Sequence, residues 1–374
     1  MRFVHTSDWQ IGMKAAHVGG AGRKVREERL AAAGRVVEAA KDFGAEFILV
    51  AGDTFENNGV DRIYVQKVAD ILSGFGVPVF IIPGNHDPFC PGSVWEHPSW
   101  GGAQGISVLT AEEPVEIPGG LLFPCPITDR YSSRDPTGWI DTSGCSGLKI
   151  GVAHGNVEGI NPEDHYHPVP VDAAKRHGLD YLALGHWHSY LPFETGGSVR
   201  MAYSGTHEPT RFGERESGQV LLVEIDLGGQ GPSIQVKKTG RLKWLSLEER
   251  IIQQGELTGV RERIESMTRP EEKLIHLTLS GILHLDESEE LPRIEEIIAS
   301  RFLYGRMETG GLRPLPDDSQ LLAALPAGII RDSASRLLEL SDPSYAGERP
   351  TDGTPEVAAL AFLELYSMAR EVGA

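Results

Sequence analysis

Short apolar runs in the first half of the chain end, one after another, at polar side chains. The runs span residues 2–6, 47–51, 77–82, 148–153 and 181–184. Their length and their β-branched and aromatic content predict buried strands. Apolar positions recur mostly at three- and four-residue steps in residues 23–43, which predicts an amphipathic helix, and residues 62–74 predict a second one. The order strand, helix, strand, helix, strand is typical of a parallel α/β sheet.

Later runs extend this pattern with a short helix near residues 171–177 and with further strands. These strands are predicted at residues 106–109, 121–124, 199–203, 218–226 and 233–239. We expect the last three to form an antiparallel meander, because a Gly-rich turn separates the final pair. Together the elements predict the α/β class and a four-layer α/β/β/α sandwich.

The pattern changes from about Lys243. Helices at residues 256–267 and 287–302 and strands at 273–280 and 303–308 predict a small α+β cap domain. Two more helices are predicted at residues 329–340 and 354–371. We therefore predict three parts, a main domain at residues 1–242, a cap domain at 243–312 and a helical C-terminal region at 313–374. The last helix has a wide apolar stripe, which either folds back on the cap or docks on a partner.

The polar residues at the strand ends are of the types that bind divalent metal ions. They are Asp8, Asp53, Asn85, His86, Asp87, His154, His186 and His188. Because the carboxyl ends of strands in α/β sheets line the ligand crevice, we expect these side chains to converge. Their oxygen and nitrogen donors suit Mn²⁺, Zn²⁺ or Fe²⁺. A bridging carboxylate holds two such ions about 3.5–4 Å apart, where they lower the pKa of a bound water and stabilise a phosphate undergoing displacement.

Five motifs in order resemble the motif set of the calcineurin-like metallophosphoesterases. They are Asp8-Trp9-Gln10, Gly52-Asp53, Gly84-Asn85-His86-Asp87, Ala153-His154-Gly155 and Gly185-His186-Trp187-His188. More narrowly, residues 5–9 and 203–213 resemble the bacterial SbcD nuclease, its YhaO-type relatives and their archaeal and eukaryotic counterpart, the Mre-eleven nuclease. The resemblance covers residues 1 to about 225, and five ordered motifs are far more specific than one.

The resemblance implies a centre of two metal ions and the role of each residue in it. One ion is expected to bind Asp8, Gln10, Asp53 and His188, and the other Asp53, Asn85, His154 and His186. His86 is expected beside the phosphate, where an imidazole can protonate the leaving oxygen or stabilise charge, with Asp87 orienting it. The family usually has histidine in place of Gln10, whose neutral oxygen donor favours Mn²⁺ over Zn²⁺.

Contacts to the substrate are predicted from positions next to the motifs, where Glu56, His207 and Arg211 are the candidates. Trp95 and Trp100 lie in a loop-rich segment, where they either stack on bases or serve as loop anchors or a dimer contact. Their isolation favours an anchor or a dimer contact over stacking. The formal net charge of −18 argues against bulk electrostatic coating of DNA, so basic residues must act locally. These basic residues either contact DNA or form an ordinary solvated face. They are Lys14, Arg23, Lys24, Arg26, Arg29, Arg211 and Arg215.

The function that the resemblance implies is Mn²⁺-dependent hydrolysis of DNA ends in DNA repair. It includes 3′ to 5′ exonuclease and single-strand endonuclease activity, a homodimer formed through residues 62–105, and an SbcC-like coiled-coil ATPase as partner. Gln10 and the acidic charge leave open a nucleotide diphosphatase for ADP-ribose or CDP-alcohols, or a cyclic-nucleotide phosphodiesterase. A non-catalytic scaffold is the alternative of another class. Three cysteines without paired spacing, no leader and no membrane-length apolar run predict a cytoplasmic protein without a membrane anchor.

Overall fold

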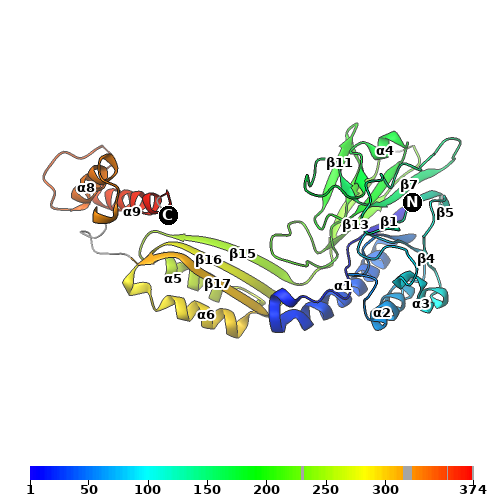
Figure 1. Cartoon of the computed structure of the whole chain (residues 1–374), viewed down its shortest axis with the longest axis horizontal. Coiled ribbons are helices and arrows are strands. Elements are labelled where there is room, and N and C mark those ends of the chain that lie inside the picture. The colour runs from blue at the N-terminus through cyan, green and yellow to red at the C-terminus, as the bar shows by residue number, and fades with distance from the viewer. Residues whose placement is uncertain (229–230, 315–321, 352, 373–374) are drawn as a thin grey trace. The chain divides into compact units, whose positions relative to one another are not determined.

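The computed structural model describes residues 1–228, 231–314, 322–351 and 353–372. The chain forms two compact units, Met1–Lys243 and Trp244–Ala374 (Figure 1). The predicted boundary between a cap domain and a helical C-terminal region stays a prediction, and residues 315–321 beside it lie outside the described part. Among the described helices, none has the length and apolarity needed to cross a membrane.

The first unit contains a six-stranded sheet in the order β14-β13-β1-β2-β3-β4. Its strands are β1 (Arg2–Thr6), β2 (Phe47–Ala51), β3 (Val79–Ile82), β4 (Ile106–Val108), β13 (Gln219–Glu224) and β14 (Ser233–Lys238). The first four are parallel, and helices α1 (Gly22–Phe43) and α2 (Arg62–Ser73) connect β1 to β2 and β2 to β3. The predicted order of strands and helices is therefore confirmed for this region.

A second six-stranded sheet has the order β11-β12-β10-β7-β6-β5. Its strands are β5 (Val115–Ile117), β6 (Gly120–Cys125), β7 (Leu148–His154), β10 (Tyr181–Gly185), β11 (Leu191–Thr195) and β12 (Ser198–Tyr203). Smaller elements of this unit are α3 (Pro98–Gly102), α4 (Ala173–Arg176), β8 (Asn156–Val157) and β9 (Pro168–Val169).

The predicted meander of three antiparallel strands is confirmed for its final pair, β13 and β14, and is wrong for β12. Strand β12 pairs in parallel with β10 in the second sheet, whereas β13 pairs with β1 and β14 in the first. The segment between β12 and β13 crosses from one sheet to the other, and the isolated bridge between Ser7 and Thr206 joins it to the end of β1. A sequence pattern shows strands but not which sheet each one enters.

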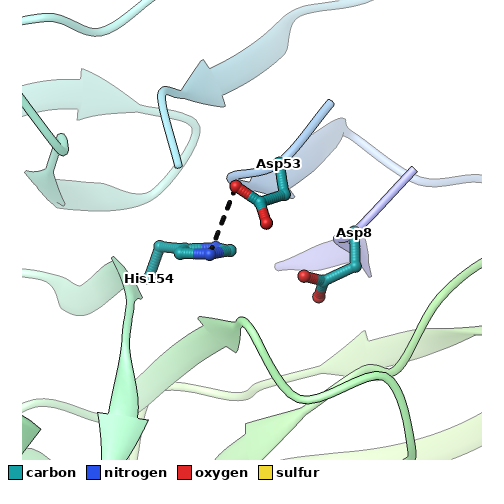
Figure 2. Close-up of side chains that lie close together, drawn as sticks. All are labelled: Asp8, Asp53 and His154. Atoms are coloured by element: carbon teal, nitrogen blue, oxygen red, sulfur yellow. Dashed lines mark ion pairs between the residues drawn. The ribbon is translucent and has the colours of Figure 1, made fainter. Parts of the chain in front are cut away.

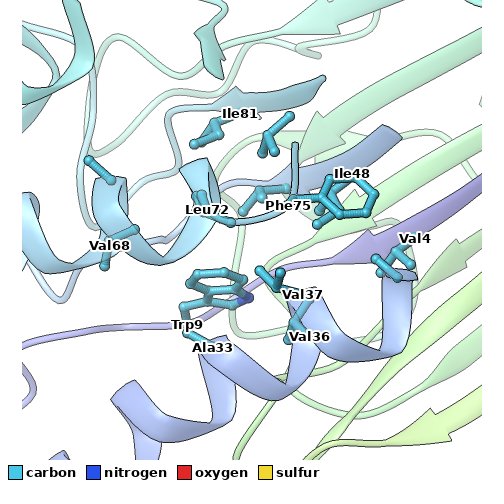
Figure 3. Close-up of a cluster of buried hydrophobic side chains, with 14 of the residues drawn as sticks. Val4, Trp9, Ala33, Val36, Val37, Ile48, Val68, Leu72, Phe75 and Ile81 are labelled. Carbon is cyan, nitrogen blue, oxygen red and sulfur yellow. The ribbon is translucent and has the colours of Figure 1, made fainter. Parts of the chain in front are cut away.

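Apolar side chains fill three layers between these elements. Phe3, Leu49 and Ile82 of the first sheet pack against residues such as Ile150 and Ala183 of the second. On the outer face of the first sheet, α1 and α2 cover a cluster that includes Val4, Trp9, Val36, Ile48 and Leu72 (Figure 3). Helix α4 covers the outer face of the second sheet through Ala173 and Ala174. The predicted α/β/β/α arrangement is confirmed.

The two loop tryptophans belong to this core. Trp95 and Trp100 are only 5% and 8% exposed, and their ring centroids lie 5.5 Å apart. Both make edge contacts with Phe55, at 5.7 and 6.2 Å. They anchor the loop and are not a surface on which bases can stack.

The second unit has a three-stranded sheet in the order β15-β16-β17, with β16 and β17 parallel. Its elements are β15 (Lys243–Ile251), α5 (Glu256–Glu265), β16 (Lys273–Leu283), α6 (Glu290–Arg301), β17 (Tyr304–Pro314), α8 (Ile329–Ser341) and α9 (Pro355–Val372). Helices α5 and α6 pack on the sheet through Val260, Ile294 and Ile298. Helices α8 and α9 bury Ala334, Phe362 and Tyr366 together with Ile282 of β16.

Candidate metal centre

Asp8, Asp53 and His154 converge where β1, β2 and β7 end (Figure 2). One donor atom from each residue lies within 4.8 Å of the others, and all three residues are buried. Two carboxylates and an imidazole at the carboxyl ends of parallel strands are a donor set that divalent ions accept. The three residues therefore form a candidate metal site.

The backbone carrying these donors is held in unfavourable conformations. The φ angle is 55° at Asp8, 41° at Gln10, 51° at Asp53 and 111° at His186, in a region that non-glycine residues rarely adopt. Cross-loop hydrogen bonds fix this geometry, since Asp8 N–H donates to the Gly52 carbonyl at 3.1 Å and Gln10 N–H donates to the Asp53 carbonyl at 2.9 Å. Such strain persists only where the surroundings impose it, and it concentrates at functional sites.

Glycines let the strand ends approach one another closely. A Cβ atom added at Gly84 would lie 2.2 Å from Asp53 Oδ1. One added at Gly185 would lie 1.8 Å from the Ala51 carbonyl oxygen and 2.8 Å from His154 Nδ1. Only a residue without a side chain fits at either position, because the donors are packed against the backbone of the neighbouring loop.

His154 keeps one ring nitrogen free for the site. Its Nδ1 lies 2.9 Å from the Ala51 carbonyl oxygen, which can only accept, so Nδ1 carries the proton. Its Nε2 faces Asn85 Oδ1 at 2.8 Å and Asp53 Oδ1 at 3.4 Å. Although burial disfavours the charged ring, the Asp53 carboxylate raises the pKa of His154 to about 9. Burial also opposes ionisation of Asp53, but His154 holds the pKa of Asp53 well below its usual range.

His186 also has one ring nitrogen bound to an acceptor and the other facing the site, but here Nε2 is the bound nitrogen and Nδ1 faces the site. Its Nε2 lies 2.7 Å from Asp164 Oδ2, and its Nδ1 faces Asn85 Oδ1 at 3.1 Å. The backbone N–H of His186 also donates to Asp8 Oδ2 at 3.0 Å. Asn85 thus lies between two imidazole nitrogens, at distances that place its oxygen among the same group of donors.

His188 points a ring nitrogen at Asp8. Its Nδ1 lies 2.8 Å from Glu214 Oε1, and its Nε2 is 4.0 Å from Asp8 Oδ1. Burial lowers the pKa of His188, but the hydrogen bond to Glu214 and the charges of Asp8 and Glu214 together raise it above its usual value. Each of the three histidines therefore has one nitrogen bound to a fixed acceptor and the other facing the site, which is the arrangement of metal-binding imidazoles. The residues present fit divalent metal ions.

The comparison with known families agrees with this site. The model of the calcineurin-like phosphoesterase family matches residues 1–190, just over half of the 374-residue chain. The chain belongs to the calcineurin-like phosphoesterases. It is a hydrolase of phosphoester bonds, and its family binds divalent metal ions.

Relatives of this phosphoesterase are distant. It is similar to the uncharacterized metallophosphoesterase YhaO of Bacillus subtilis (strain 168), with 27% identity over 175 residues. The matched part is 44% of this chain and 42% of YhaO, so the chain spans less than half the length of that protein. TT1561 of Thermus thermophilus, a solved structure, has 14% identity and a TM-score of 0.41 over 64% of this chain and 98% of that one.

A buried arginine of α1 binds the loop that follows β1 and carries Asp8. Arg29 is 1% exposed, and its guanidinium donates to the carbonyl oxygens of Trp9 at 3.0 Å, Asp8 at 3.2 Å and Glu208 at 2.6 Å. It also donates to Thr206 Oγ1 at 3.3 Å, while burial lowers its pKa to about 10. The prediction that Arg29 is a surface residue able to contact DNA is wrong, because its side chain is inside the protein.

His86 is half-buried beside the phosphoesterase site. Its Nδ1 lies 3.0 Å from the Glu56 carbonyl oxygen, and its backbone N–H donates to Asp53 Oδ1 at 2.9 Å. Because the carbonyl can only accept, His86 Nδ1 carries a proton and Nε2 is the nitrogen left for other contacts. Glu56 therefore acts on His86 through its backbone.

Asp87 does not have the role expected of it. It is fully buried, and its carboxylate accepts hydrogen bonds from Gly84 N–H at 2.7 Å and Phe55 N–H at 2.8 Å. Burial and the nearby Asp53 charge raise the pKa of Asp87 to about 8. The expectation that Asp87 orients His86 is corrected. Asp87 joins the loop after β2 to the loop after β3, and the Glu56 carbonyl binds the His86 ring.

The other two candidates for substrate contact, His207 and Arg211, differ in exposure. His207 is fully buried, its ring stacks on Trp9 with centroids 5.0 Å apart, and its Nε2 lies 2.8 Å from the Arg29 carbonyl oxygen. It therefore supports the loop from beneath and does not reach a bound substrate. Arg211 has a side chain that is 71% exposed, with Nε 3.7 Å from Glu214 Oε1, so it is available at the edge of the site.

Sequence reasoning missed three residues that hold the metal donors, namely Arg29, Asp164 and Glu214. Each is a charged residue in a segment without a motif, and its partner lies at least 20 residues away. Asp164 and Glu214 could have been suspected only by asking which carboxylate binds the second nitrogen of each histidine.

Proposed function

We propose that this phosphoesterase is a Mn²⁺-dependent DNA phosphodiesterase that removes nucleotides 3′ to 5′ from DNA ends and cleaves single strands, in DNA repair. The motif resemblance to SbcD-type nucleases supports the DNA substrate, and the similarity to the metallophosphoesterase YhaO supports the hydrolytic chemistry. The observation that carries it is the arrangement of the three histidines, each bound through one nitrogen and open at the other. That geometry suits two metal ions acting on one phosphodiester.

The proposed ligands divide between the two ions. Asp8, Gln10, Asp53 and His188 would hold one ion, and Asp53, Asn85, His154 and His186 the other. When bound, the pair of ions supplies an activated water and charge stabilisation for the phosphate. Gln10 departs from the family pattern, and it is buried on the same strained loop as Asp8.

His86 is proposed to protonate the leaving oxygen from Nε2. The Glu56 carbonyl, 3.0 Å from Nδ1, favours the ring with a proton on that nitrogen, so Nε2 is the nitrogen that gains and loses the second proton. An imidazolium at that position contributes about 10²- to 10⁴-fold to the rate as a general acid. Asp53 Oδ1 fixes the backbone of His86, so the acid and the metal donors move as one unit.

The test uses purified protein, Mn²⁺ and end-labelled linear DNA. Release of nucleotides that stops when the metal is removed is the expected result. His86→Gln should lower turnover at least about 100-fold. It should still bind the same number of ions as the parent chain by calorimetry, because His86 is not a proposed ligand. No Mn²⁺-dependent cleavage of any DNA, alone or with a coiled-coil ATPase, would overturn the proposal.

A nucleotide diphosphatase is the second candidate, and two observations favour it. Gln10 stands where related nucleases usually have histidine, and the net charge of −18 weakens electrostatic attraction of DNA. Turnover of ADP-ribose or of a cyclic nucleotide without cleavage of DNA would favour it over the first proposal. Fewer than two bound ions at saturating Mn²⁺, with no hydrolysis of any ester, would instead point to a non-catalytic scaffold.

The proposed partners follow from the same resemblance. A homodimer through residues 62–105 and an SbcC-like coiled-coil ATPase on α8 and α9 are both proposals. Sedimentation of the isolated chain tests the dimer, and co-purification with the ATPase tests the docking.

A further inference from the structure

Two loops outside the ligand set lie against the metal centre and against each other. The first is residues 128–136 and the second residues 158–167. His167 N–H donates to the Ser132 carbonyl at 2.7 Å, and His167 Nε2 lies 3.3 Å from the Arg130 carbonyl oxygen. His167 is buried, and its carbonyl oxygen lies so near Gly155 that a Cβ there would be 2.1 Å away. The two loops are thus fixed to one another and to the residue that follows His154.

Each loop presents a tyrosine to solvent beside the other. Tyr131 is 61% exposed and Tyr166 is 47% exposed, and their ring centroids lie 4.8 Å apart at 53°. Every other Phe, Tyr or Trp of the chain lies in the described ranges and is at least partly buried. The Arg130 guanidinium lies 5.6 Å from the centre of the Tyr131 ring. A pair of exposed rings beside a cation is therefore a feature of this one surface.

A short chain of contacts connects the tyrosine pair to the metal donors. The Tyr166 N–H donates to Asp164 Oδ1 at 3.0 Å, and Asp164 Oδ2 lies 2.7 Å from His186 Nε2. Two residues of extended chain span at most about 7 Å. Successive phosphates of one DNA strand are about 3.4 Å apart along a duplex and further apart in an extended strand. The backbone of Tyr166 therefore lies within about two nucleotide steps of the residue that holds His186.

We infer that Tyr131 and Tyr166 form a stacking surface for an unpaired nucleobase of the strand whose phosphodiester lies at the metal centre. The inference rests on the proposed function and names the part of the substrate that this surface binds. Aromatic side chains stack on any base, since every base has a π-face, and an arginine adds a cation–π contact. Because a paired base is stacked inside its duplex, this surface selects single-stranded DNA or a frayed end.

The charge of the protein makes such a surface useful. With a net charge of −18, phosphate contacts alone provide little affinity for DNA. Stacking does not depend on charge, so binding through the tyrosines is expected to weaken less with salt than binding through lysines and arginines. Trp95 and Trp100 cannot serve in their place because they are buried.

The test is a titration of the full chain with an eight-residue oligothymidylate that carries 2-aminopurine at its 3′ end. The chain carries His86→Gln and Mn²⁺ is present, so the proposed metal centre is occupied while cleavage is slowed at least about 100-fold. Stacking on the tyrosines quenches the fluorescence of the base. Tyr131→Ala and Tyr166→Ala should each weaken binding about 5- to 100-fold, as expected for the loss of one stacked base. Tyr131→Phe and Tyr166→Phe keep the ring and should bind like the parent chain.

Val171→Ala is the matched control, since Val171 is 56% exposed in the same unit. Thermal unfolding of each variant checks that it folds. Absence of quenching, or equal affinities for the alanine and phenylalanine variants, would overturn the inference. Cleavage of the same strand by the unsubstituted chain in Mn²⁺ tests the proposed function separately. Cleavage without quenching supports that function and contradicts the stacking surface. Quenching without cleavage supports the stacking surface and contradicts the proposed function.

Discussion

A histidine that binds a metal through one nitrogen needs a fixed acceptor for the other, and the three candidate histidines of this phosphoesterase have three different acceptors. The Ala51 carbonyl, the Asp164 carboxylate and the Glu214 carboxylate hold His154, His186 and His188, respectively. The motifs show the histidines but not these partners, because each partner is distant in sequence or belongs to the backbone. At the scale of residues, the motifs predicted that Asp8, Asp53 and His154 converge, but they did not predict the groups that orient the histidines.

Glu214→Gln tests this at one histidine. The amide can still accept from His188 Nδ1, but it lacks the charge that strengthens the bond and makes the imidazole a better donor. Calorimetry should show Mn²⁺ binding that is about 10- to 100-fold weaker. Glu216→Gln is the control, since Glu216 is exposed and no metal donor contacts it among the described contacts. Equal affinity of the two variants would show that Glu214 does not position His188.

Protonation of His154 predicts opposite effects of pH with and without metal. In the metal-free protein its pKa is raised from 6.5 to about 9. The charged ring therefore stabilises the fold fully below pH 6.5, and this stability is lost as the pH rises through about 9. A metal ion must displace the proton, so Mn²⁺ affinity should rise over the same range.

Thermal unfolding from pH 6.5 to pH 9 measures both effects. The midpoint should fall with pH in EDTA, and the extra stability given by a fixed concentration of Mn²⁺ should grow. Parallel curves in the two buffers would mean that no proton leaves when the metal binds.

At the scale of elements, helix α1 does more than cover the sheet. Its apolar stripe packs on β1 and β2, and Arg29 on the same helix binds the carbonyls of Asp8, Trp9 and Glu208. One buried guanidinium thus joins the loop after β1 to the loop before β13. In an amphipathic pattern an arginine predicts a solvated position, and only the packing of two distant loops over α1 reverses that prediction.

Arg29→Met should destabilise the protein by about 2–4 kcal/mol, because several buried carbonyls lose their donor and a methionine cannot replace it. The same variant should bind Mn²⁺ more weakly, since the Asp8 loop is no longer fixed. Arg26→Met is the control, because the Arg26 guanidinium donates to the Lys14 carbonyl in an exposed position. It should change stability by less than about 0.5 kcal/mol. Urea unfolding of both variants checks the comparison, and similar losses would contradict it.

The elements themselves were largely visible in the sequence. Apolar runs predicted β1, β2, β7 and β10, because burial on both faces leaves a simple pattern. Apolar positions at helical spacing predicted α1 and α2, because each buries one face. The strands β5, β8, β9 and β11 were missed because each is short and lacks a continuous apolar run of about four or more residues. The sheet of β12 was misassigned because nothing in residues 204–218 shows that the chain crosses there from the second sheet to the first.

At the scale of the whole molecule, the ligands lie in one unit. All the proposed metal donors and Tyr131 and Tyr166 fall within Met1–Lys243, which has its own three-layer core. The second unit has a separate core around α5, α6 and its own sheet. We therefore expect metal binding by the first unit not to require the second.

Residues 1–243 produced alone should fold cooperatively and bind Mn²⁺ with the affinity of the full chain within about threefold. Calorimetry and circular dichroism measure the two properties. The matching fragment is residues 244–374, which should bind no metal at the same concentrations. Aggregation of the first fragment, or loss of its metal binding, would show that the two units depend on each other.

The close approach at Gly84 and Gly185 has a consequence for protein engineering. Copying the polar ligands onto another parallel sheet would not recreate this centre, because a methyl group at either glycine would occupy the space of Asp53 or of the Ala51 carbonyl. A designer would have to transfer the bare backbone between the strands along with the side chains. The site depends on the missing side chains at Gly84 and Gly185 as much as on the donors themselves.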